Sequence, residues 1–201
     1  MNTSSNILII NGSYRQGGTT DQVTSSMTNV LSIQGAEVES IYLRDYPINF
    51  CLNCRECMQS TGLTPGKCVH DDQMQKLVDK IEQADAYILA APTNLGSVTS
   101  IFKRFMERLS VFAFWPWGQN APKYRKDKAS RKKAILVSSC AAPGFIGRWF
   151  YHTHSQLKLT ARIIGADVVE TLFTGLQSDS REGKLSEKKK ISAEIAATKL
   201  I

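Results

Sequence analysis

The sequence predicts an α/β fold in which helices cover both faces of a parallel sheet. Short apolar runs rich in β-branched residues alternate with segments of helical periodicity, and Gly or Pro often follows these runs. No internal repeat or linker divides the chain. With 201 residues, of which 42% are hydrophobic, the composition is that of one globular domain. We therefore expect a single domain over residues 1–201.

The N-terminal half predicts three strands separated by two helices. Residues 7–10 form an apolar run before Asn11 and Gly12, and the segment that follows has the periodicity of an amphipathic helix. Residues 37–43 alternate polar and apolar, as a strand near a sheet edge does. The predicted elements are strands at 7–10, 37–43 and 86–91, a helix at 19–34, and a helix that Asp71 or Asp72 caps.

The C-terminal half continues the alternation with two strands and three helices. From Thr99 onward, apolar residues keep a helical period while charged residues occupy the other face. The remaining elements are strands at 134–139 and 167–174, a helix at 148–164, and a last helix from about Ser186. The complete prediction is a doubly wound sandwich of five strands and five helices.

Ligands of such sheets bind beyond the carboxyl ends of the strands, so the loops there are candidate sites. The first loop, Gly12–Thr20, combines flexible glycines, the hydroxyls of Ser13, Thr19 and Thr20, and the charge of Arg15 at the start of a helix. These groups together predict a phosphate-binding loop. The spacing matches neither the P-loop nor the dinucleotide fingerprint. The alternative is a glycine-rich turn in which Thr19 only caps the helix.

Two further loops follow the third and fourth predicted strands. Pro92–Val98 offers backbone donors and a flat apolar wall, which suit a planar, partly polar ring such as isoalloxazine. Ser139–Gly144 carries small side chains that let the backbone approach the edge of such a ring. The sequence therefore indicates one ligand site built from three loops.

The segments Gly12–Thr20, Ala91–Val98 and Phe102–Arg108 resemble the NAD(P)H-dependent FMN reductase family of flavodoxin-like proteins, and the resemblance extends to about Thr174. It implies a flavodoxin-like three-layer sandwich with strand order 2-1-3-4-5, non-covalently bound FMN, and NAD(P)H as co-substrate. It also implies a homodimer or homotetramer with the flavin near a subunit interface. The implied cofactor-binding residues are Ser13, Arg15, Gly18, Thr19 and Thr20 for the phosphate; Pro92, Thr93, Asn94, Leu95, Gly96 and Ser97 for the ring; and Ser139, Cys140, Ala141 and Gly144 from the third loop.

Four of the five cysteines, Cys51, Cys54, Cys57 and Cys68, lie in one loop whose spacing is similar to that of iron–sulfur flavoproteins within this family. The insertion before the fourth cysteine is longer than in the compact form of that motif. Three interpretations stay open: free or redox thiols, a [4Fe–4S] cluster, and zinc. We favour free thiols and predict no metal. Cys140 stands apart as a small packing residue beside the flavin.

Almost all of the net charge of +7 lies in the segment Lys123–Lys133. We interpret this segment as a solvated loop, or otherwise as a region that attracts an anionic cofactor such as a pyridine nucleotide. It lacks the interleaved aromatic residues of a nucleic-acid-binding surface, so we expect no nucleic-acid partner. The chain carries no apolar run of membrane-spanning length and no signal-peptide pattern, so we expect a cytoplasmic protein without a membrane partner.

The expected function is that of an oxidoreductase. A nicotinamide cofactor would pass hydride through FMN to a small-molecule acceptor such as a quinone, an azo or nitro compound, or a flavin, with no side chain acting as acid or base. A one-electron carrier with a cluster in the cysteine loop is the first alternative, and a flavin-bound regulatory or interaction module is the second. The aromatic run Phe112–Trp117 is expected in the core and a subunit contact, or else in the wall facing the flavin.

Overall fold

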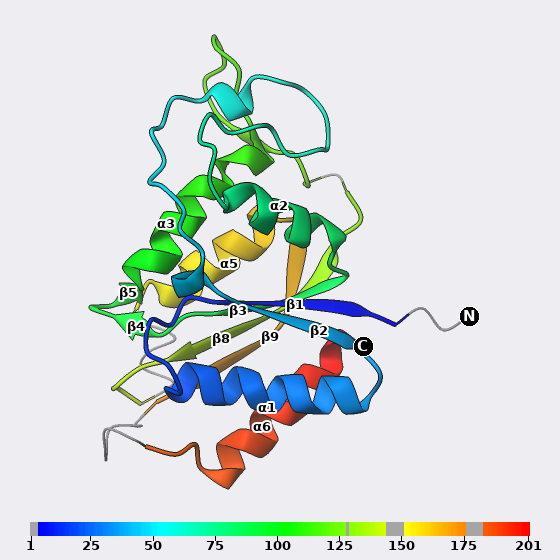
Figure 1. Cartoon of the computed structure of the whole chain (residues 1–201), viewed down its shortest axis with the longest axis vertical. Helices are drawn as coiled ribbons and strands as arrows, with labels where there is room; N and C mark the ends of the chain where they lie inside the picture. The colour runs from blue at the N-terminus through cyan, green and yellow to red at the C-terminus, as the bar shows by residue number, and fades with distance from the viewer. Residues whose placement is uncertain (1–3, 128, 144–150, 176–182) are drawn as a thin grey trace.

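A computed structural model describes residues 4–127, 129–143, 151–175 and 183–201. Its central feature is a five-stranded sheet in the order β2-β1-β3-β8-β9, in which all neighbouring strands are parallel (Figure 1). This order confirms the predicted flavodoxin-like arrangement. The strands are β1 (Asn6–Asn11), β2 (Glu37–Tyr42), β3 (Ala86–Ala90), β8 (Lys132–Ser139) and β9 (Ala166–Thr174).

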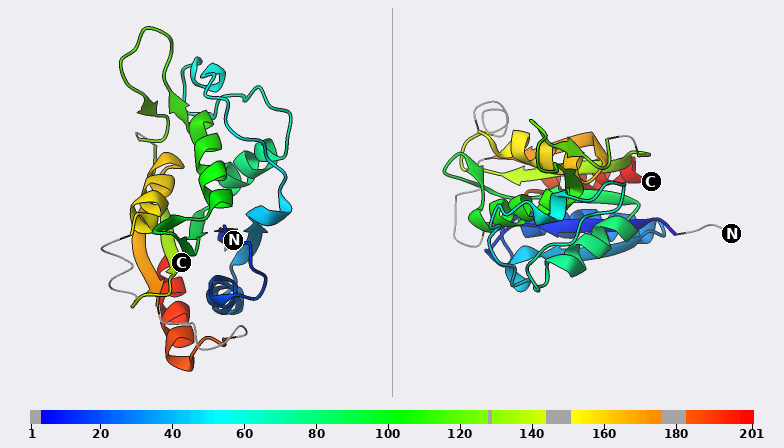
Figure 2. Two further views of the ribbon diagram at one scale, coloured as in Figure 1. Left: turned by 90° about the vertical axis from the view of Figure 1, so that its left-hand side faces the viewer. Right: turned by 90° about the horizontal axis from the view of Figure 1, so that it is seen from above.

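Helices cover both faces of the sheet (Figures 1 and 2). Because successive strand residues point to opposite faces, Ile7 and Ile9 of β1 pack in one apolar core, while Leu8 and Ile10 pack in the other. Helices α1 (Thr19–Ile33) and α6 (Glu187–Ala197) cover the first face, and α2 (Met74–Gln83), α3 (Ser100–Arg108) and α5 (Thr153–Ile163) cover the second. No helix among the described residues is long and apolar enough to cross a membrane.

Most predicted elements are present with shifted ends. Gln73, rather than Asp71 or Asp72, is the residue that precedes α2, but the carboxylate of Asp72 accepts a hydrogen bond from the N–H of Met74, the first helical residue, at 3.0 Å. β8 begins two residues before the predicted Ala134, because Lys132 pairs with Ala166 on the neighbouring strand. The predicted start of α5 at Arg148 lies outside the described residues.

A hairpin and the cysteine loop extend the molecule beyond α2 and α3 (Figure 2). The hairpin strands are β6 (Ala113–Phe114) and β7 (Lys123–Tyr124). They lie beside the cysteine loop, where the N–H of Trp115 donates to the carbonyl oxygen of Met58 at 2.9 Å. Phe112 is fully buried, as expected for a core residue, whereas Trp117 at the other end of the aromatic run is 63% exposed and lies outside the core. The short helices η1 (Leu43–Asp45), η2 (Glu56–Met58), η3 (Leu109–Phe112) and η4 (Thr198–Leu200) complete the fold.

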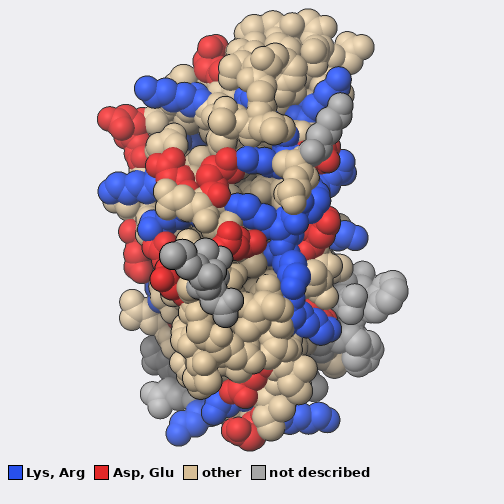
Figure 3. Space-filling view, turned by 90° about the vertical axis from the view of Figure 1, so that its right-hand side faces the viewer, with Lys and Arg blue, Asp and Glu red and all other residues tan. Residues whose placement is uncertain are grey.

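The basic segment Lys123–Lys133 differs from the predicted solvated loop. Arg125 is buried, and its guanidinium donates to the carbonyl oxygens of Val111, Ser60 and Cys57 at 2.8–3.2 Å. The segment leads into the amino end of β8, away from the loops at the carboxyl ends of the strands. On the face of Figure 3, Lys and Arg side chains lie among Asp and Glu. We conclude that Arg125 serves the fold, and that the solvated-loop interpretation is wrong for this residue.

Helix α3 packs directly against the chain that leaves β1. The hydroxyl of Thr99 donates to the carbonyl oxygen of Gly12 at 2.6 Å, and the N–H of Gly12 donates to Ala90 at 2.7 Å. A Cβ atom on Gly12 would lie 2.6 Å from Cδ2 of Phe102, closer than such atoms can approach. The close packing of α3 therefore requires glycine at this position.

This contact predicts that Gly12→Ala destabilises the protein by about 1–3 kcal/mol, because the added methyl overpacks against Phe102. Denaturant unfolding measures the change. In a Phe102→Gly background the same substitution should cost much less, since both the ring and the Cβ that would lie 2.8 Å from the added methyl are gone and the two changes are coupled. Equal costs in both backgrounds would contradict the proposed contact.

Candidate functional site

The loop after β1 leads into the first turn of α1, a position whose free N–H groups suit an anion. Gly17 adopts a left-handed conformation with φ of 66°, and Gly18 is the residue that precedes the helix. Gly18 provides no side-chain cap, so the first N–H groups of α1 face a ligand without a competing protein acceptor. The alternative interpretation, in which Thr19 caps the helix, is wrong because Thr19 is already the first helical residue.

A buried polar network fixes this loop. The side-chain amide of Asn11 donates to Asp21 at 2.8 Å, and its oxygen accepts from the N–H of Ser13 at 2.8 Å. The other carboxylate oxygen of Asp21 accepts from the N–H of Gly17 at 3.0 Å. Arg44 lies 3.5 Å from the same oxygen and donates to the carbonyl of Ser13 at 2.8 Å. The carboxylate is therefore paired, and its charge opposes anion binding less than an unpaired one would.

The second predicted loop is a small hairpin. Thr93–Asn94 (β4) pairs antiparallel with Ser97–Val98 (β5), and Leu95 and Gly96 adopt positive φ angles of 47° and 77° at the turn. Positive φ at both turn residues gives the hairpin turn whose twist matches the strands. The hairpin holds Asn94 at the edge of a cavity, while Leu95 is fully exposed at the tip.

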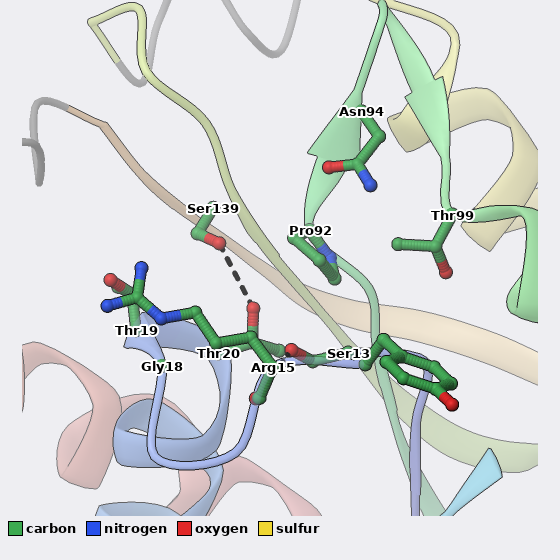
Figure 4. A pocket seen from close by; sticks show the side chains of 10 residues that line it. Ser13, Arg15, Gly18, Thr19, Thr20, Pro92, Asn94, Thr99 and Ser139 are labelled. Carbon is green, nitrogen blue, oxygen red and sulfur yellow. Dashed lines mark hydrogen bonds between the residues drawn. The ribbon is translucent and has the colours of Figure 1, made fainter. Parts of the chain in front are cut away.

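The three loops enclose a cavity of about 440 Å³ at the carboxyl ends of the strands. Figure 4 shows the first loop along one side of it, with Pro92, Asn94 and Ser139 across from that loop. The hydroxyl oxygens of Ser139 and Thr20 lie 3.0 Å apart and join the two sides. The predicted site residues that line the cavity are Ser13, Arg15, Gly18, Thr19, Thr20, Pro92, Asn94 and Ser139.

Two lining residues, Tyr14 and Thr99, are missing from the predicted set. Tyr14 lies within the first loop, and its position between Ser13 and Arg15 is the only signal for it in the sequence. Thr99 caps α3 by accepting from the N–H of Phe102 at 3.3 Å. A cap residue directly after a predicted binding loop is a signal that could have identified Thr99.

Other predicted residues lie behind the cavity wall. Thr93 lies 2.9 Å from the hydroxyl of Thr153, and Ser97 donates to Gln156 at 2.9 Å, so both fasten the hairpin to α5. Cys140 is buried, its Sγ donates to the carbonyl of Ala142 at 3.2 Å, and burial raises the pKa of its thiol. The remaining residues outside the lining are Leu95, Gly96 and Ala141; Gly144 lies outside the described residues.

The thiols of the cysteine loop gather on one side of α3. Burial, together with the nearby thiols of Cys68, Cys51 and Cys54, raises the pKa of Cys57 to about 11. The guanidinium of Arg108 donates to Sγ of Cys68 at 3.4 Å. Four thiols in one region suit the ligand chemistry of iron–sulfur clusters and zinc. Within the described ranges, however, no three His, Cys, Asp or Glu side chains are placed to hold a metal ion.

A buried ion pair anchors this loop to α3. Both terminal nitrogens of Arg108 donate to the carboxylate of Asp72, at 2.6 and 3.1 Å, and the N–H of Asn49 donates to Asp72 at 2.8 Å. Burial alone would raise the pKa of Asp72, but the hydrogen bonds from Arg108, Asn49 and Met74 outweigh it and lower the pKa to about 2. Asp72 is thus held in the charged form that Arg108 requires.

The family model described as NADPH-dependent FMN reductase matches residues 5–173. The chain belongs to this family. Membership confirms the resemblance drawn from the first two binding loops, and it agrees with the cavity at the carboxyl ends of the strands.

Relatives of the reductase family extend the comparison. An iron–sulfur flavoprotein of Archaeoglobus fulgidus is 33% identical over 105 residues, which are 52% of this chain and 46% of the relative. The match thus spans about half the length of that protein. YwqN of Bacillus subtilis, named as an NAD(P)H-dependent FMN-containing oxidoreductase, is 32% identical over 134 residues, 66% of this chain and 65% of YwqN. The solved NAD(P)H:quinone oxidoreductase of Methanothermobacter marburgensis has a TM-score of 0.67 at 18% identity, with 98% of this chain and 96% of that chain covered, and supports the fold.

The cavity of this FMN reductase family member fits FMN in its donor chemistry. One end offers the uncapped N–H groups of α1, two threonine hydroxyls and Arg15, all suited to a phosphate. The other end offers Pro92 and Asn94 against a planar ring. The volume lies within the range of small-molecule sites, about 300–1,000 Å³. Phosphate and ring can therefore be held at opposite ends.

The ion pair of Asp72 predicts acid sensitivity of the cysteine loop. A carboxyl whose pKa is lower in the folded protein stabilises the fold above its unfolded pKa, so this contribution is lost as the pH falls from about 4 to 2. The free energy of unfolding, measured against pH, should fall over this range more steeply for the wild type than for Asp72→Asn.

The exposed neighbour Asp71 provides the control, since Asp71→Asn should retain the wild-type pH dependence. At pH 7, Asp72→Asn should cost up to about 3–5 kcal/mol, because it leaves Arg108 buried without its counter-charge. If both variants follow the wild-type pH curve, the ion pair does not stabilise the folded state.

Proposed function

We propose that the chain binds FMN in the cavity between the three loops and passes hydride from NAD(P)H to a small-molecule acceptor. The observation that carries this proposal is the cavity itself, where an anion-binding helix start faces the Pro92–Asn94 wall. The family match and the name of YwqN support the same chemistry. Steady-state oxidation of NADPH and NADH by the FMN-loaded protein, with acceptors added singly, tests it.

In this proposal the chain's own residues bind and orient rather than exchange protons. Arg15, Thr19 and Thr20 hold the phosphate, and Asn94 and Pro92 position the ring. FMN, when bound, supplies the hydride chemistry. The lining contains hydroxyl, amide, guanidinium and backbone groups, and among the described residues no carboxylate, His, Lys or Cys side chain is part of it. This composition suits a reaction in which a cofactor, not a side chain, carries the chemistry.

We include the acceptor and the assembly in the proposal. A quinone, an azo or nitro compound, or free flavin is the proposed acceptor class, and the name of the Methanothermobacter neighbour is consistent with quinones. We also propose a homodimer or homotetramer with the flavin near the subunit interface.

The phosphate assignment predicts that Arg15→Ala weakens FMN binding by about 1.5–3 kcal/mol, the value of a charge-assisted hydrogen bond. Fluorescence titration of the apoprotein measures the affinity. Riboflavin, which lacks the phosphate, should bind both proteins equally. Gln16→Ala, an exposed neutral change in the same loop, serves as the control. If affinity for FMN is unchanged, Arg15 does not bind the phosphate.

A second candidate function is that of an iron–sulfur flavoprotein electron carrier. The gathering of Cys51, Cys54, Cys57 and Cys68 favours it, together with the name of the Archaeoglobus relative. We still propose free thiols as the first hypothesis, because hydride transfer through flavin needs no one-electron relay. In addition, packing and the hydrogen bond from Arg108 already order the loop. The donor set alone fits either state.

Free thiols predict that Cys54→Ser leaves flavin content and reductase activity nearly unchanged. The measurement is iron and acid-labile sulfide per chain after anaerobic purification, with Cys140→Ser as the control outside the loop. About four iron and four sulfide per chain in the wild type and in the control, lost in Cys54→Ser, would establish the cluster and support the electron-carrier function.

A further inference from the structure

Within the described residues, Arg15 and Arg104 are the two arginines whose guanidinium groups neither donate a hydrogen bond nor form an ion pair in the protein. A guanidinium carries five N–H donors, and a charge without an acceptor is suited to an anionic ligand. The other described arginines pair with carboxylates or donate to carbonyl oxygens. They are Arg44, Arg55, Arg108, Arg125, Arg131 and Arg162.

Arg104 lies on α3 and lines a second pocket, of about 200 Å³, with Tyr14, Phe50, Ser100 and Ile101. Its guanidinium carbon is 5.6 Å from the centre of the Phe50 ring. Nε is shielded from solvent and has no hydrogen-bond partner. The aromatic ring thus holds one side of the guanidinium, and the donors remain available to a group that enters the pocket.

This pocket adjoins the proposed flavin site. Tyr14 lines both cavities, and the consecutive residues Thr99 and Ser100 line the first and the second. A ligand that reaches over the flavin can therefore extend past Tyr14 to Arg104. The two arginines line different cavities: Arg15 lies at the proposed phosphate end of the first cavity, and Arg104 lies in the second.

The charge around Arg104 also suits an anion. No carboxylate is part of the described lining of either pocket. The acidic residue that follows on α3, Glu107, pairs with Lys103 at 3.4 Å on the exposed side of the helix. The aromatic side chains of Tyr14 and Phe50 are 73% and 68% exposed, so they offer flat surfaces to a ring or ribose beside the charge.

We propose that Arg104 binds a phosphate of the nicotinamide dinucleotide, with Phe50 and Tyr14 flanking the bound nucleotide. The inference rests on the proposed function and identifies where its co-substrate is held. The phosphate belongs either to the pyrophosphate that NADH and NADPH share or to the 2′-phosphate that only NADPH carries. Both forms of the proposal require the same bidentate donor at Arg104.

The experiment compares FMN-loaded wild type, Arg104→Ala, Arg104→Lys and the control Lys103→Ala. Lys103 is exposed on the same helix, so its truncation removes an equal charge without removing the proposed contact. KM and kcat are measured with NADPH, with NADH, and with 1-benzyl-1,4-dihydronicotinamide, a hydride donor that has no phosphate. Bound FMN is quantified in each variant.

Arg104→Ala should raise KM for the dinucleotide about 10- to 100-fold, while kcat, FMN content and the rate with the phosphate-free donor stay near wild type. Arg104→Lys should recover part of the lost affinity, because lysine keeps the positive charge but lacks the paired N–H donors of the guanidinium. An increase for NADPH alone assigns the 2′-phosphate, and an equal increase for both dinucleotides assigns the pyrophosphate. Lys103→Ala should match the wild type.

Three results would overturn the inference. KM unchanged for both dinucleotides in an FMN-loaded Arg104→Ala contradicts it and leaves the proposed function standing. An equal loss with the phosphate-free donor means that Arg104 acts on the flavin site instead. A change in oligomeric state by light scattering, with KM unchanged, means that Arg104 contacts a second copy of the chain.

Failure of the proposed function has a different signature. In that case the FMN-loaded wild type oxidises neither dinucleotide and also fails with the phosphate-free donor. Titration of the wild type and Arg104→Ala with NADP⁺, followed by flavin absorbance, then decides the Arg104 inference separately. Binding to the wild type that is weakened in Arg104→Ala supports it, and the absence of binding overturns it.

Discussion

The contact between α3 and Gly12 positions the side chains of Thr99, Arg104 and Arg108. With no Cβ on Gly12, the ring of Phe102 packs against the chain leaving β1, and Thr99 hydrogen-bonds to the same residue. The helix is therefore fixed relative to the sheet at its first turn. From there it carries Thr99 at the cavity between the three loops, Arg104 at the second pocket and Arg108 at the cysteine loop. One close backbone contact thus sets the geometry of three regions.

Buried arginines hold together the segments that lie outside the regular helices and strands. Arg108 joins Asp72, the carbonyl of Asn49 and the thiol of Cys68, and Arg125 joins the hairpin to three carbonyls of the cysteine loop. Buried pairs of this kind add little net stability compared with apolar packing, but the loss of one partner is costly. Here these pairs specify how the loops are arranged, because carbonyls and a carboxylate from distant segments can satisfy each guanidinium only in this arrangement.

The sequence predicts the local elements of this structure but not the contacts between residues that are far apart in sequence. The alternation of strands and helices follows from periodicity and from glycine positions, and the strand order follows from the family resemblance. The pairing of Asp72 with Arg108 joins residues 36 positions apart, and no local pattern reports it. Arg125 is a second example: its neighbours in sequence predict a charged loop, but in the folded protein it is buried beside the hairpin. Residues that bind through the fold cannot be recognised from their neighbours in sequence.

Helix α3 also bears on the two candidate functions. From its cap residue Thr99 to Arg108 it spans roughly 14 Å at about 1.5 Å per residue, so a rigid element of fixed length joins the cavity between the three loops to the cysteine loop. Arg108 and Asp72 hold the loop at the far end through an ion pair and a hydrogen bond to the thiol of Cys68. Within the described residues, no three His, Cys, Asp or Glu side chains are placed to hold a metal ion. A cluster would therefore require the thiols to move from these positions, whereas free thiols would not.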